Sequence, residues 1–341
     1  MEKIPELKCL PERILDLLFG AVQSRLLVAA VRLKVFDTLQ SERSAEEVSE
    51  LLGTHPDNTC LMLRGLTALN LLHCRNGVYV NGPEARAFLD AGSPACIGRW
   101  MVEAFEMFEP VIRNMEAVMT DGPGRRQADE HMNSEEMCAF YTHSHARSEL
   151  AGIARKTASV VGALPEYPGF RKMLDLGGGP GLNSVAILER NPELTGVIFD
   201  RGSVVAIAEE YIRHYGMTGR ITTRAGDYTR DDPGSGYDLI LASDTLYYEP
   251  GELTRMASGL CNALNPGGVL VGIHGVLHRD RTAPCRSVIG ILPEALTGRG
   301  DLPDSGFLAP CLLRAGFASV HTREVHLGFG PMEVDIARKT V

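Results

Sequence analysis

A glycine-rich turn between a predicted strand and a predicted helix is the strongest constraint on how this chain folds. The apolar run 173–176 leads into Gly177-Gly178-Gly179-Pro180-Gly181, and a helix is predicted from about residue 183 to residue 190. Glycines at such a turn let the backbone approach a ligand closely. Strands and helices then alternate, which indicates βαβ units and a parallel sheet. Strands are expected at 173–176, 196–200, 237–242, 269–273, 319–325 and 332–339.

The first half of the chain, up to about residue 165, is predicted to be mainly helical. Apolar residues at helical spacing begin near Leu15, and Ser44 with Glu47 forms a capping box for a second helix. Pro56 opens a third helix. Two short strands then flank Asn76-Gly77, a residue pair typical of a type I′ turn. Helix, helix and hairpin in this order are typical of a winged helix.

Charge argues against a nucleic-acid partner for this winged helix. Between residues 41 and 90 there are four Lys or Arg and seven Asp or Glu, a balance of −3, and the whole chain of 341 residues has a net charge of −9. A protein that holds nucleic acid needs basic side chains against the phosphates. We therefore expect a scaffold or dimerisation module that makes a homodimer.

Cysteine usage and apolar patterning indicate the compartment. The eight cysteines are widely spaced, without a CxxC pair, so free thiols in a reducing compartment are expected. The first six residues lack a signal-peptide core. No run of about 18 uninterrupted apolar residues is present in the sequence. These features predict a cytoplasmic protein without a membrane partner.

Two acidic residues indicate what the glycine-rich turn holds. Asp200 ends the next predicted strand, nineteen residues after Gly181, where a carboxylate accepts both hydroxyls of a ribose. A nicotinamide site also has an acid there, but Asp175 beside the turn would repel a pyrophosphate. A positively charged ligand suits Asp175 better. S-adenosylmethionine carries an ammonium and a sulfonium and no phosphate, so it is the expected cofactor.

These motifs together resemble a known family. The segment 174–181 (Leu-Asp-Leu-Gly-Gly-Gly-Pro-Gly), Asp200, Gly226-Asp227-Tyr228 and 264–268 (Leu-Asn-Pro-Gly-Gly) are similar to those of class I S-adenosylmethionine-dependent methyltransferases. More narrowly, nearly the whole chain resembles the caffeate-type and bacterial polyketide O-methyltransferases, which have an N-terminal winged-helix dimerisation domain. The resemblance implies an α/β fold with a seven-stranded Rossmann-like sheet, parallel apart from a reversed last strand.

The resemblance also implies the organisation of the chain. A winged-helix-like dimerisation domain is expected at 1–95, a helical region that forms the substrate pocket at 96–165, and the cofactor-binding domain at 166–341. It implies an intertwined homodimer, a small-molecule acceptor, S-adenosylhomocysteine as product and no catalytic metal.

The cofactor residues implied by the resemblance lie in four segments. The turn holds the methionine part, Asp200 binds the ribose, the segment after the third strand flanks the adenine, and the end of the fourth strand lies near the sulfonium. For Asp227, a turn cap is the alternative role. The expected cofactor-binding residues are Asp175, Gly177, Gly178, Gly179, Gly181, Asp200, Arg201, Asp227, Tyr228 and Ser243.

The sequence departs from the family where the catalytic base is expected. In the O-methyltransferases the fourth strand runs into a segment resembling Leu-His-Asp-Trp, whose histidine takes the proton from a phenol. Here Tyr247 stands in place of that histidine and Tyr248 in place of the acid. A tyrosine with an ordinary pKa of about 10 is protonated at neutral pH and is a poor general base.

This departure favours an acceptor that loses no proton before it attacks. A thioether is nucleophilic as it stands, and an activated carbon loses its proton afterwards, so alignment and desolvation are what the enzyme supplies. Tyr247 would orient the acceptor, and its ring would stabilise a cation. The favoured prediction is S-methylation of a thioether carboxylic acid such as 4-methylthio-2-hydroxybutyrate, as in the S-methyltransferases of dimethylsulfoniopropionate synthesis, which the chain resembles.

Other readings stay open. A phenolic or polyketide O-methyltransferase would use His274 or His145 as its base, and a tetrapyrrole C-methyltransferase also accommodates the tyrosine. A regulator that senses S-adenosylmethionine without catalysis is disfavoured by the acidic winged helix. His145 lies on one predicted helix with other candidates for the acceptor site, although a core or solvated role is an alternative for each. The expected substrate-binding residues are Phe105, Phe108, Tyr141, His145, Arg147, Tyr247 and Glu294.

Overall fold

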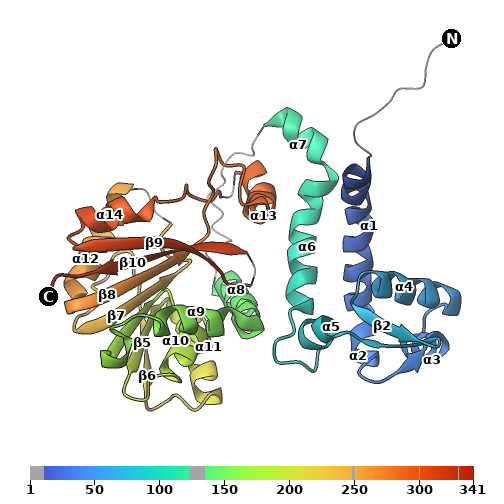
Figure 1. Cartoon of the computed structure of the whole chain (residues 1–341), viewed down its shortest axis with the longest axis horizontal. Coiled ribbons are helices and arrows are strands. Elements are labelled where there is room, and N and C mark those ends of the chain that lie inside the picture. Colours follow the sequence, from blue (N-terminus) through green and yellow to red (C-terminus); the bar gives the residue numbers. More distant parts are fainter. Residues whose placement is uncertain (1–10, 123–134, 248–249, 299, 329) are drawn as a thin grey trace, which may run out of the picture. The chain divides into compact units, whose positions relative to one another are not determined.

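The computed structural model of the chain describes residues 11–122, 135–247, 250–298, 300–328 and 330–341 (Figure 1). The chain forms two compact units, 1–107 and 108–341. The domain limits expected at residues 95 and 165 stay a prediction. The seven cysteines within the described ranges are free thiols, as expected.

The first unit contains the predicted helices and hairpin. The Ser44 hydroxyl accepts a hydrogen bond from the Glu47 backbone N–H, and the Glu47 carboxylate accepts one from the Ser44 N–H, so the capping box is confirmed. Asn76 and Gly77 both have positive φ, as a type I′ turn requires. The elements are α1 (Glu12–Arg32), α2 (Val35–Thr38), β1 (Arg43–Ser44), α3 (Ala45–Leu52), α4 (Pro56–Ala68), β2 (Leu72–Arg75), β3 (Val78–Asn81) and α5 (Pro83–Phe88).

A small sheet and a buried apolar cluster hold the first unit together. The three strands lie in the order β1-β3-β2, and all neighbours are antiparallel. Phe36, Leu63 and Leu66 are almost fully buried at the centre of the cluster. Burial of three large side chains at this depth contributes about 1.5–3 kcal/mol each. The helices and the hairpin therefore form one packed module.

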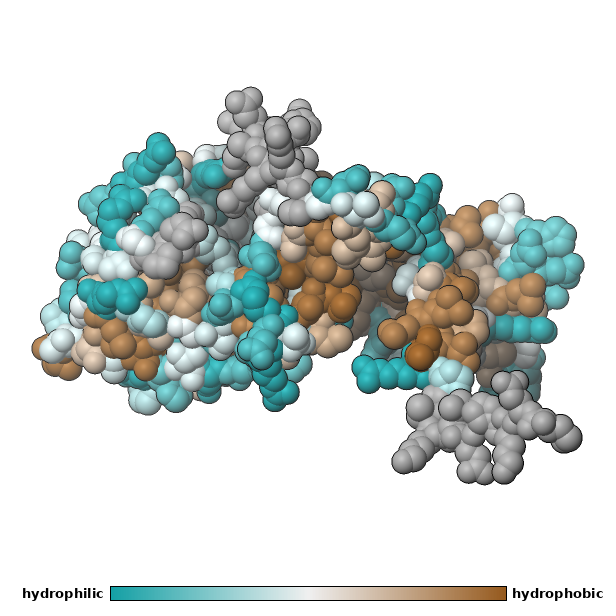
Figure 2. All heavy atoms as spheres, turned by 90° about the horizontal axis from the view of Figure 1, so that it is seen from above, coloured by the Kyte–Doolittle hydropathy of each residue, from teal (hydrophilic) through white to brown (hydrophobic). Residues whose placement is uncertain are grey.

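Helix α1 leaves a large apolar face without cover in the single chain. Leu17 is 74% exposed and Val22 is 64% exposed, and apolar side chains form a brown patch over α1 in Figure 2. Among the described residues, α1 is the one helix long and apolar enough to cross a membrane, with a mean hydropathy of 1.8, although length and composition alone are weak evidence. An apolar face of this kind marks a contact surface.

The second unit is built on the predicted seven-stranded sheet. The strand order is β6-β5-β4-β7-β8-β10-β9, and only β10 runs antiparallel to its neighbours. This confirms the parallel sheet with a reversed last strand. The strands are β4 (Lys172–Leu176), β5 (Thr195–Asp200), β6 (Ile221–Ala225), β7 (Tyr237–Ser243), β8 (Leu264–His274), β9 (Ser319–His326) and β10 (Pro331–Arg338).

Helices cover both faces of this sheet (Figure 1). One buried cluster joins the sheet to α9–α11, and a second joins its other face to α12 and α14. Helix α6 continues across the boundary between the two units. The helices are α6 (Gly98–Arg113), α7 (Met115–Asp121), α8 (Glu135–Ser148), α9 (Ala154–Gly162), α10 (Leu182–Leu188), α11 (Gly202–His214), α12 (Pro250–Ala263), α13 (Cys285–Leu296) and α14 (Leu308–Arg314).

The order of the strands positions the functional site. The chain starts the sheet at β4 and adds β5 and β6 on one side and β7 and β8 on the other. Ligands of such sheets bind beyond the carboxyl ends of the strands where the order reverses. Here that point lies beyond the ends of β4, β5 and β7, where Asp175, Asp200 and Ser243 occur.

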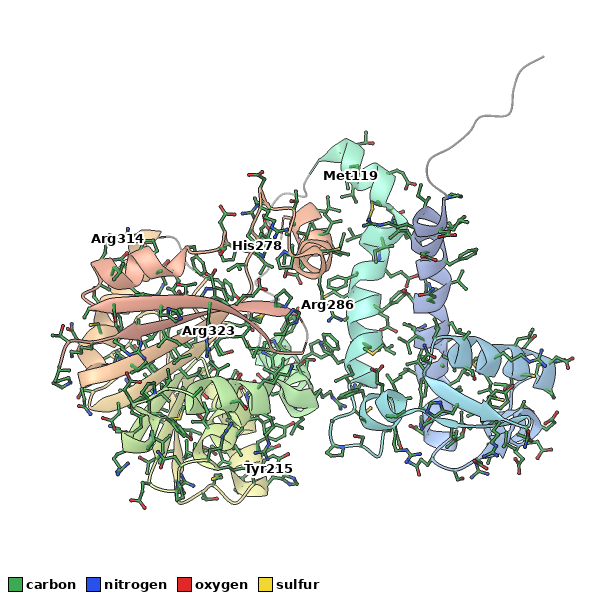
Figure 3. All side chains as sticks on the ribbon, viewed as in Figure 1. Met119, Tyr215, His278, Arg286, Arg314 and Arg323 are labelled. Atoms are coloured by element: carbon green, nitrogen blue, oxygen red, sulfur yellow. The ribbon has the colours of Figure 1, made fainter. Side chains whose placement is uncertain are left out.

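Strand β8 differs from the sequence-based expectation, which begins it at residue 269. It begins at Leu264, because Leu264 pairs with Tyr237 across a bulge, so the segment 265–268 lies inside the strand. The loop after β8 is braced by Arg281, which pairs with Asp301 at 2.7 Å and with Asp304. His278, labelled in Figure 3, marks this loop.

Candidate functional site

Three of the four expected glycines are required by the fold around the turn. A Cβ atom at Gly177 would lie 2.7 Å from the Thr245 side chain, and one at Gly178 would lie 2.8 Å from Asp175. A Cβ at Gly181 would lie 2.4 Å from Ile198. Gly179 is different, because nothing lies within 4 Å of its Cβ position although its φ is +53°. The turn therefore presents Gly179 to open space, where a ligand can approach its backbone.

We expect the glycines to separate folding from binding. Gly181→Ala forces a Cβ into Ile198 and should lower the midpoint of thermal unfolding. Gly179→Val meets open space and should keep the midpoint within a few degrees, apart from about 1–2 kcal/mol of strain at positive φ, while blocking S-adenosylmethionine binding. Thermal unfolding and calorimetric titration of both variants check this. Full cofactor affinity in Gly179→Val would contradict the placement.

Asp200 joins the end of β5 to the glycine turn. Its Oδ2 accepts a hydrogen bond from the Gly179 N–H at 3.0 Å, and its Oδ1 accepts one from the Arg201 N–H at 2.7 Å. Burial raises the pKa of Asp200 above its usual value, against these two hydrogen bonds. The carboxylate therefore lies directly beside the backbone that the ligand is expected to approach.

Two further carboxylates are buried beneath the turn. Asp175 is 1% exposed and accepts a hydrogen bond from the Ser184 hydroxyl at 2.6 Å, and burial raises its pKa to about 6. Glu149, in the turn after α8, accepts a hydrogen bond from the Asn183 N–H at 3.1 Å. Burial, with the nearby Asp175, raises the pKa of Glu149 well above its usual value. No sequence motif marks Glu149, so sequence reasoning missed it.

These carboxylates suit a cation. Burial raises the pKa of all three carboxyl groups, and the charge of Asp175 raises that of Glu149 further, as the charge of Asp200 does for Asp175, because neighbouring negative charges repel. A ligand with positive charge relieves that repulsion, whereas a phosphate increases it. An ammonium and a sulfonium therefore fit the site, and these are the charged groups that distinguish S-adenosylmethionine from a dinucleotide.

The raised pKa of Asp175 makes cofactor affinity depend on pH. The ionised carboxylate attracts the cation and the protonated carboxyl does not, so affinity should fall as the pH drops through the pKa of about 6. Between pH 7 and pH 5 we expect the dissociation constant to rise about tenfold. Asp175→Asn should bind more weakly at pH 7 and lose most of this dependence. Calorimetry at several pH values checks it, and an equally steep dependence in Asp175→Asn would contradict it.

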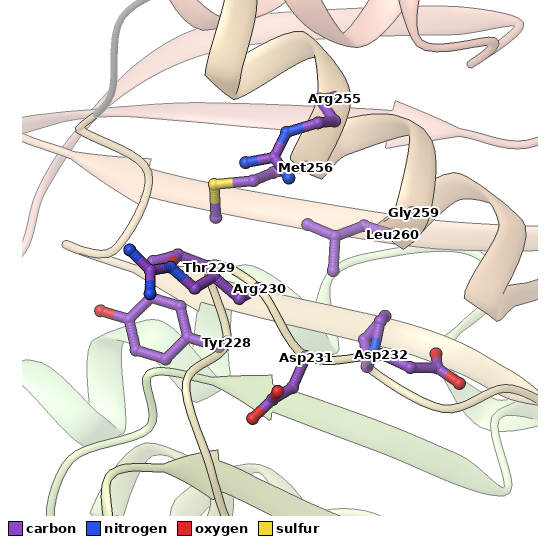
Figure 4. Close-up of a pocket in the computed structure, with 10 residues that line it drawn as sticks. Tyr228, Thr229, Arg230, Asp231, Asp232, Arg255, Met256, Gly259 and Leu260 are labelled. Carbon is purple, nitrogen blue, oxygen red and sulfur yellow. The ribbon is translucent and has the colours of Figure 1, made fainter.

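The segment expected near the adenine contains a capped turn and a hollow. The Asp227 carboxylate accepts hydrogen bonds from the Thr229 N–H at 3.0 Å and the Thr229 hydroxyl at 2.6 Å, which lower its pKa. Asp227 is thus a turn cap, and its adenine contact stays a prediction. Tyr228 packs edge-on against Phe199 and lines a cavity of about 330 Å³ with Met256 (Figure 4).

Two other expected cofactor residues flank this region. The Arg201 guanidinium donates a hydrogen bond to the Cys138 sulfur at 3.5 Å, which links the end of β5 to α8. The Ser243 carbonyl accepts a hydrogen bond from the Thr245 hydroxyl at 2.9 Å. Thr245 also donates to the Leu176 carbonyl at 3.0 Å and so fastens the end of β7 to the end of β4. Contacts of Arg201 and Ser243 with a cofactor stay predictions.

Tyr247 has its hydroxyl group engaged on both sides. The hydroxyl donates a hydrogen bond to Asp244 Oδ1 at 2.5 Å and accepts one from the Gly275 N–H at 2.9 Å. Desolvation of the hydroxyl and the Asp244 carboxylate raise the pKa of Tyr247 well above its usual value. The phenol is therefore protonated at neutral pH and cannot accept a proton. Tyr248 lies outside the described residues.

His274 is buried beneath Tyr247. It is 1% exposed, and its Nε2 lies 3.4 Å from Glu333 Oε1 and 3.3 Å from Asp335 Oδ2. Desolvation lowers the pKa of His274, but hydrogen bonding to Asp335 and Glu333 outweighs it and the pKa is raised. An imidazole that is 1% exposed and faces two carboxylates through its Nε2 is not accessible to an acceptor. This environment argues against His274 as the base.

His145 has the opposite character. Its side chain on α8 is accessible, and desolvation lowers its pKa although Asp244 and Asp200 oppose the shift. The imidazole is therefore neutral at pH 7. The charge of Arg147, one helical half-turn further on, acts on Tyr211 of α11. A role for His145 or Arg147 in acceptor binding stays a prediction.

The remaining expected acceptor residues lie on three helices. Tyr141 on α8 packs edge-on against Phe140. Phe105 belongs to the first unit, where the Arg25 guanidinium lies 4.7 Å from its ring centre. Phe108 on α6 and Glu294 on α13 are half-buried in the second unit. Their part in acceptor binding stays a prediction.

Comparisons with known proteins identify related chains. The chain is 29% identical over 280 residues to 3-hydroxy-5-methyl-1-naphthoate 3-O-methyltransferase of Streptomyces sahachiroi, which covers 80% of each chain. It is 26% identical over 343 residues to L-tyrosine C(3)-methyltransferase of Streptomyces lavendulae, covering 95% of this chain and 91% of that one. The relatives therefore include methyltransferases named for oxygen and for carbon acceptors.

A solved structure shares the fold. Human N-acetylserotonin methyltransferase in complex with S-adenosylmethionine superposes with a TM-score of 0.79 and 21% identity, covering 99% of this chain and 100% of that chain. Residues 15–91 match the O-methyltransferase dimerisation domain and residues 124–300 match the O-methyltransferase domain. The second match spans more than half of the chain. The chain belongs to the S-adenosylmethionine-dependent O-methyltransferase family and is a methyltransferase.

Proposed function

We propose that this enzyme transfers the methyl group of S-adenosylmethionine to the sulfur of a small thioether carboxylic acid of the 4-methylthio-2-hydroxybutyrate type. The observation that carries the proposal is the Tyr247 hydroxyl group, held between the Asp244 carboxylate and the Gly275 N–H where the family has its base. A hydroxyl fixed in this way orients an acceptor but takes no proton from it.

The chemistry of a thioether matches such a site. A sulfur lone pair attacks the methyl carbon in line, the bond between that carbon and the cofactor sulfur breaks, and S-adenosylhomocysteine leaves. The acceptor becomes a sulfonium and loses no proton, so no base is required. Alignment of the two sulfur atoms is then the main contribution of the protein. The Asp244 carboxylate and the face of the Tyr247 ring favour the cation that forms.

The acceptor carboxylate needs a positively charged or donating partner. Arg147 and His145 on α8 are the candidates, because a guanidinium binds a carboxylate through two parallel hydrogen bonds. The neighbourhood of His145 also contains Asp200 and Asp244, which would repel an anion held too close to the cofactor. We therefore assign the acceptor carboxylate to the Arg147 end of the helix.

A phenolic O-methyltransferase is the second candidate. A neutral, accessible His145 is able to take a proton, and the naphthoate relative is named for a hydroxyl acceptor. Under this alternative, His145→Ala abolishes turnover of a phenol and thioether acids are never methylated. A screen of thioether acids, phenols and tetrapyrroles for the mass added by one methyl group, with wild type and His145→Ala side by side, separates the two candidates.

Substitution of Tyr247 tests the alignment role. Tyr247→Phe removes the hydroxyl group that Asp244 and the Gly275 N–H hold in place and keeps the ring, so the loss of alignment should lower kcat/KM about tenfold, equivalent to about 0.5–1.5 kcal/mol. Removal of a general base would cost about 10²–10⁴-fold. Tyr247→Ala should cost more than Tyr247→Phe, because the ring is lost as well. Steady-state kinetics with the acceptor found in the screen provide the measurement.

We further propose that the enzyme is a cytoplasmic homodimer joined through α1. The dimerisation-domain match and the exposed face with Leu17, Leu18 and Val22 support this. Light scattering at micromolar concentration should give twice the chain mass of 37.0 kDa. Leu18→Glu should shift the mass toward that of one chain, and Gln23→Glu on the same helix is the matched control. A wild-type mass near one chain would contradict the proposal.

A further inference from the structure

A buried cluster of three ionisable side chains lies beneath Tyr247, and no role has been assigned to it. His274 at the end of β8 faces Glu333 and Asp335 on β10, and each of the three is at most 5% exposed. We propose that His274, held by Glu333 and Asp335, is a positioning residue that fixes the Tyr247 hydroxyl group for methyl transfer. This inference rests on the alignment role proposed for Tyr247.

The sheet itself brings the three side chains together. Glu333 is the cross-strand partner of His274 in the antiparallel pair β8 and β10. Asp335 follows two residues later, so its side chain lies on the same face of β10 as Glu333. The His274 Nε2 atom lies between the two carboxylates, at 3.4 Å and 3.3 Å. One imidazole is thereby shared by two carboxylates.

Both carboxylates are fixed from outside the cluster. Glu333 accepts hydrogen bonds from the Ser305 hydroxyl and, at 2.9 Å, from the Gly306 N–H. Asp335 Oδ1 accepts a hydrogen bond from the Thr322 hydroxyl on β9. Within the described residues, the second oxygen, Asp335 Oδ2, is buried without a hydrogen-bond partner, and the His274 Nε2 atom lies 3.3 Å from it. The imidazole therefore completes a network that joins β8, β9, β10 and the loop before α14.

The network reaches the reacting region through two contacts with Tyr247. The His274 ring packs edge-on against the Tyr247 ring, with ring centres 6.5 Å apart, and against Phe307 at 4.8 Å. Gly275, the next residue, donates its backbone N–H to the Tyr247 hydroxyl at 2.9 Å. A displacement of His274 would move both the ring contact and this donor. The direction in which the hydroxyl points, toward Asp244, depends on them.

A charge-matched variant tests this link without leaving extra charge in the core. His274→Gln alone would leave two buried carboxylates without a cation, which is strongly destabilising. His274→Gln combined with Asp335→Asn removes one positive and one negative charge, so the net charge of the cluster is unchanged. Glu166→Gln with Arg338→Gln removes another ion pair anchored on β10, with 2.6 Å between the charged atoms, and is the matched control.

The measurement is a double-mutant cycle with Tyr247→Phe. We expect the charge-matched variant to lower kcat about tenfold, as Tyr247→Phe does, with the affinity for S-adenosylmethionine unchanged. In the charge-matched variant, the further change Tyr247→Phe should then lower kcat by less than about twofold, because both changes remove the same contribution. The control pair should leave kcat within about twofold and should be additive with Tyr247→Phe.

Distinct results would overturn the inference. If the combined variant loses kcat by the product of the two separate losses, the cluster acts only on the general fold. A stoichiometric metal ion in the purified enzyme, lost in the charge-matched variant, would make the three side chains metal ligands instead. If that variant fails to fold, Asp335→Asn alone keeps His274 and Glu333 paired, and its loss of kcat must vanish in the Tyr247→Phe background.

Failure of the proposed function gives a different signature. If the alignment role of Tyr247 is wrong, Tyr247→Phe alone leaves kcat unchanged or lowers it by 100-fold or more, and this holds for any result of the double-mutant cycle. An additive cycle with a tenfold effect of Tyr247→Phe removes only the role of His274.

Discussion

Repulsion among buried carboxylates beyond the ends of β4 and β5 sets the character of the whole site. Glu149, Asp175 and Asp200 come from three separate elements and are held close together by backbone hydrogen bonds and a serine hydroxyl. Burial raises the pKa of all three, and repulsion adds to the rise for Glu149 beside Asp175 and for Asp175 beside Asp200. A buried charge is costly unless a partner neutralises it. The fold therefore contains a site that gains most from a cation without phosphate, which matches the cofactor of its family.

On the acceptor side of the site, carboxylates lie beside the side chains of Tyr247 and His274. Desolvation and the Asp244 carboxylate raise the pKa of Tyr247, and hydrogen bonding to two carboxylates on β10 raises that of His274. Tyr247, which stands where the resemblance implies a base, is thus a proton donor, and His274 is buried out of reach of an acceptor. This arrangement favours an acceptor whose attacking atom is already a nucleophile, and it links the choice of acceptor to charges in the sheet.

Local sequence patterns were sufficient to place the expected cofactor residues on their strand, turn and helix. Asp175, the glycines and Asp200 lie within one βαβ unit, where strand, turn and helix follow one another directly, and the structure brings Gly179 and Asp200 within hydrogen-bonding distance. The capping box at Ser44 is equally local. The reversed last strand followed from the family resemblance, since nothing in its own residues fixes its direction.

Long-range contacts account for what the sequence did not predict. Glu149 reaches the turn from a helix more than 25 residues upstream of Asp175, and it carries no motif. The environment of His274 depends on Glu333, 59 residues later, and on the pairing of β8 with β10. His274 was considered as a base because its type and position allowed it. Only the structure shows that it is buried between two carboxylates.

Proton release during a single turnover tests the central claim, methyl transfer without loss of a proton, most directly. In weak buffer with an indicator dye, enzyme saturated with S-adenosylmethionine is mixed with the acceptor, and protons released are compared with S-adenosylhomocysteine formed. A thioether acceptor predicts no proton released for each methyl group transferred, because the cofactor sulfonium is exchanged for a product sulfonium. One proton for each methyl group would contradict the account and would indicate a hydroxyl or carbon acceptor instead.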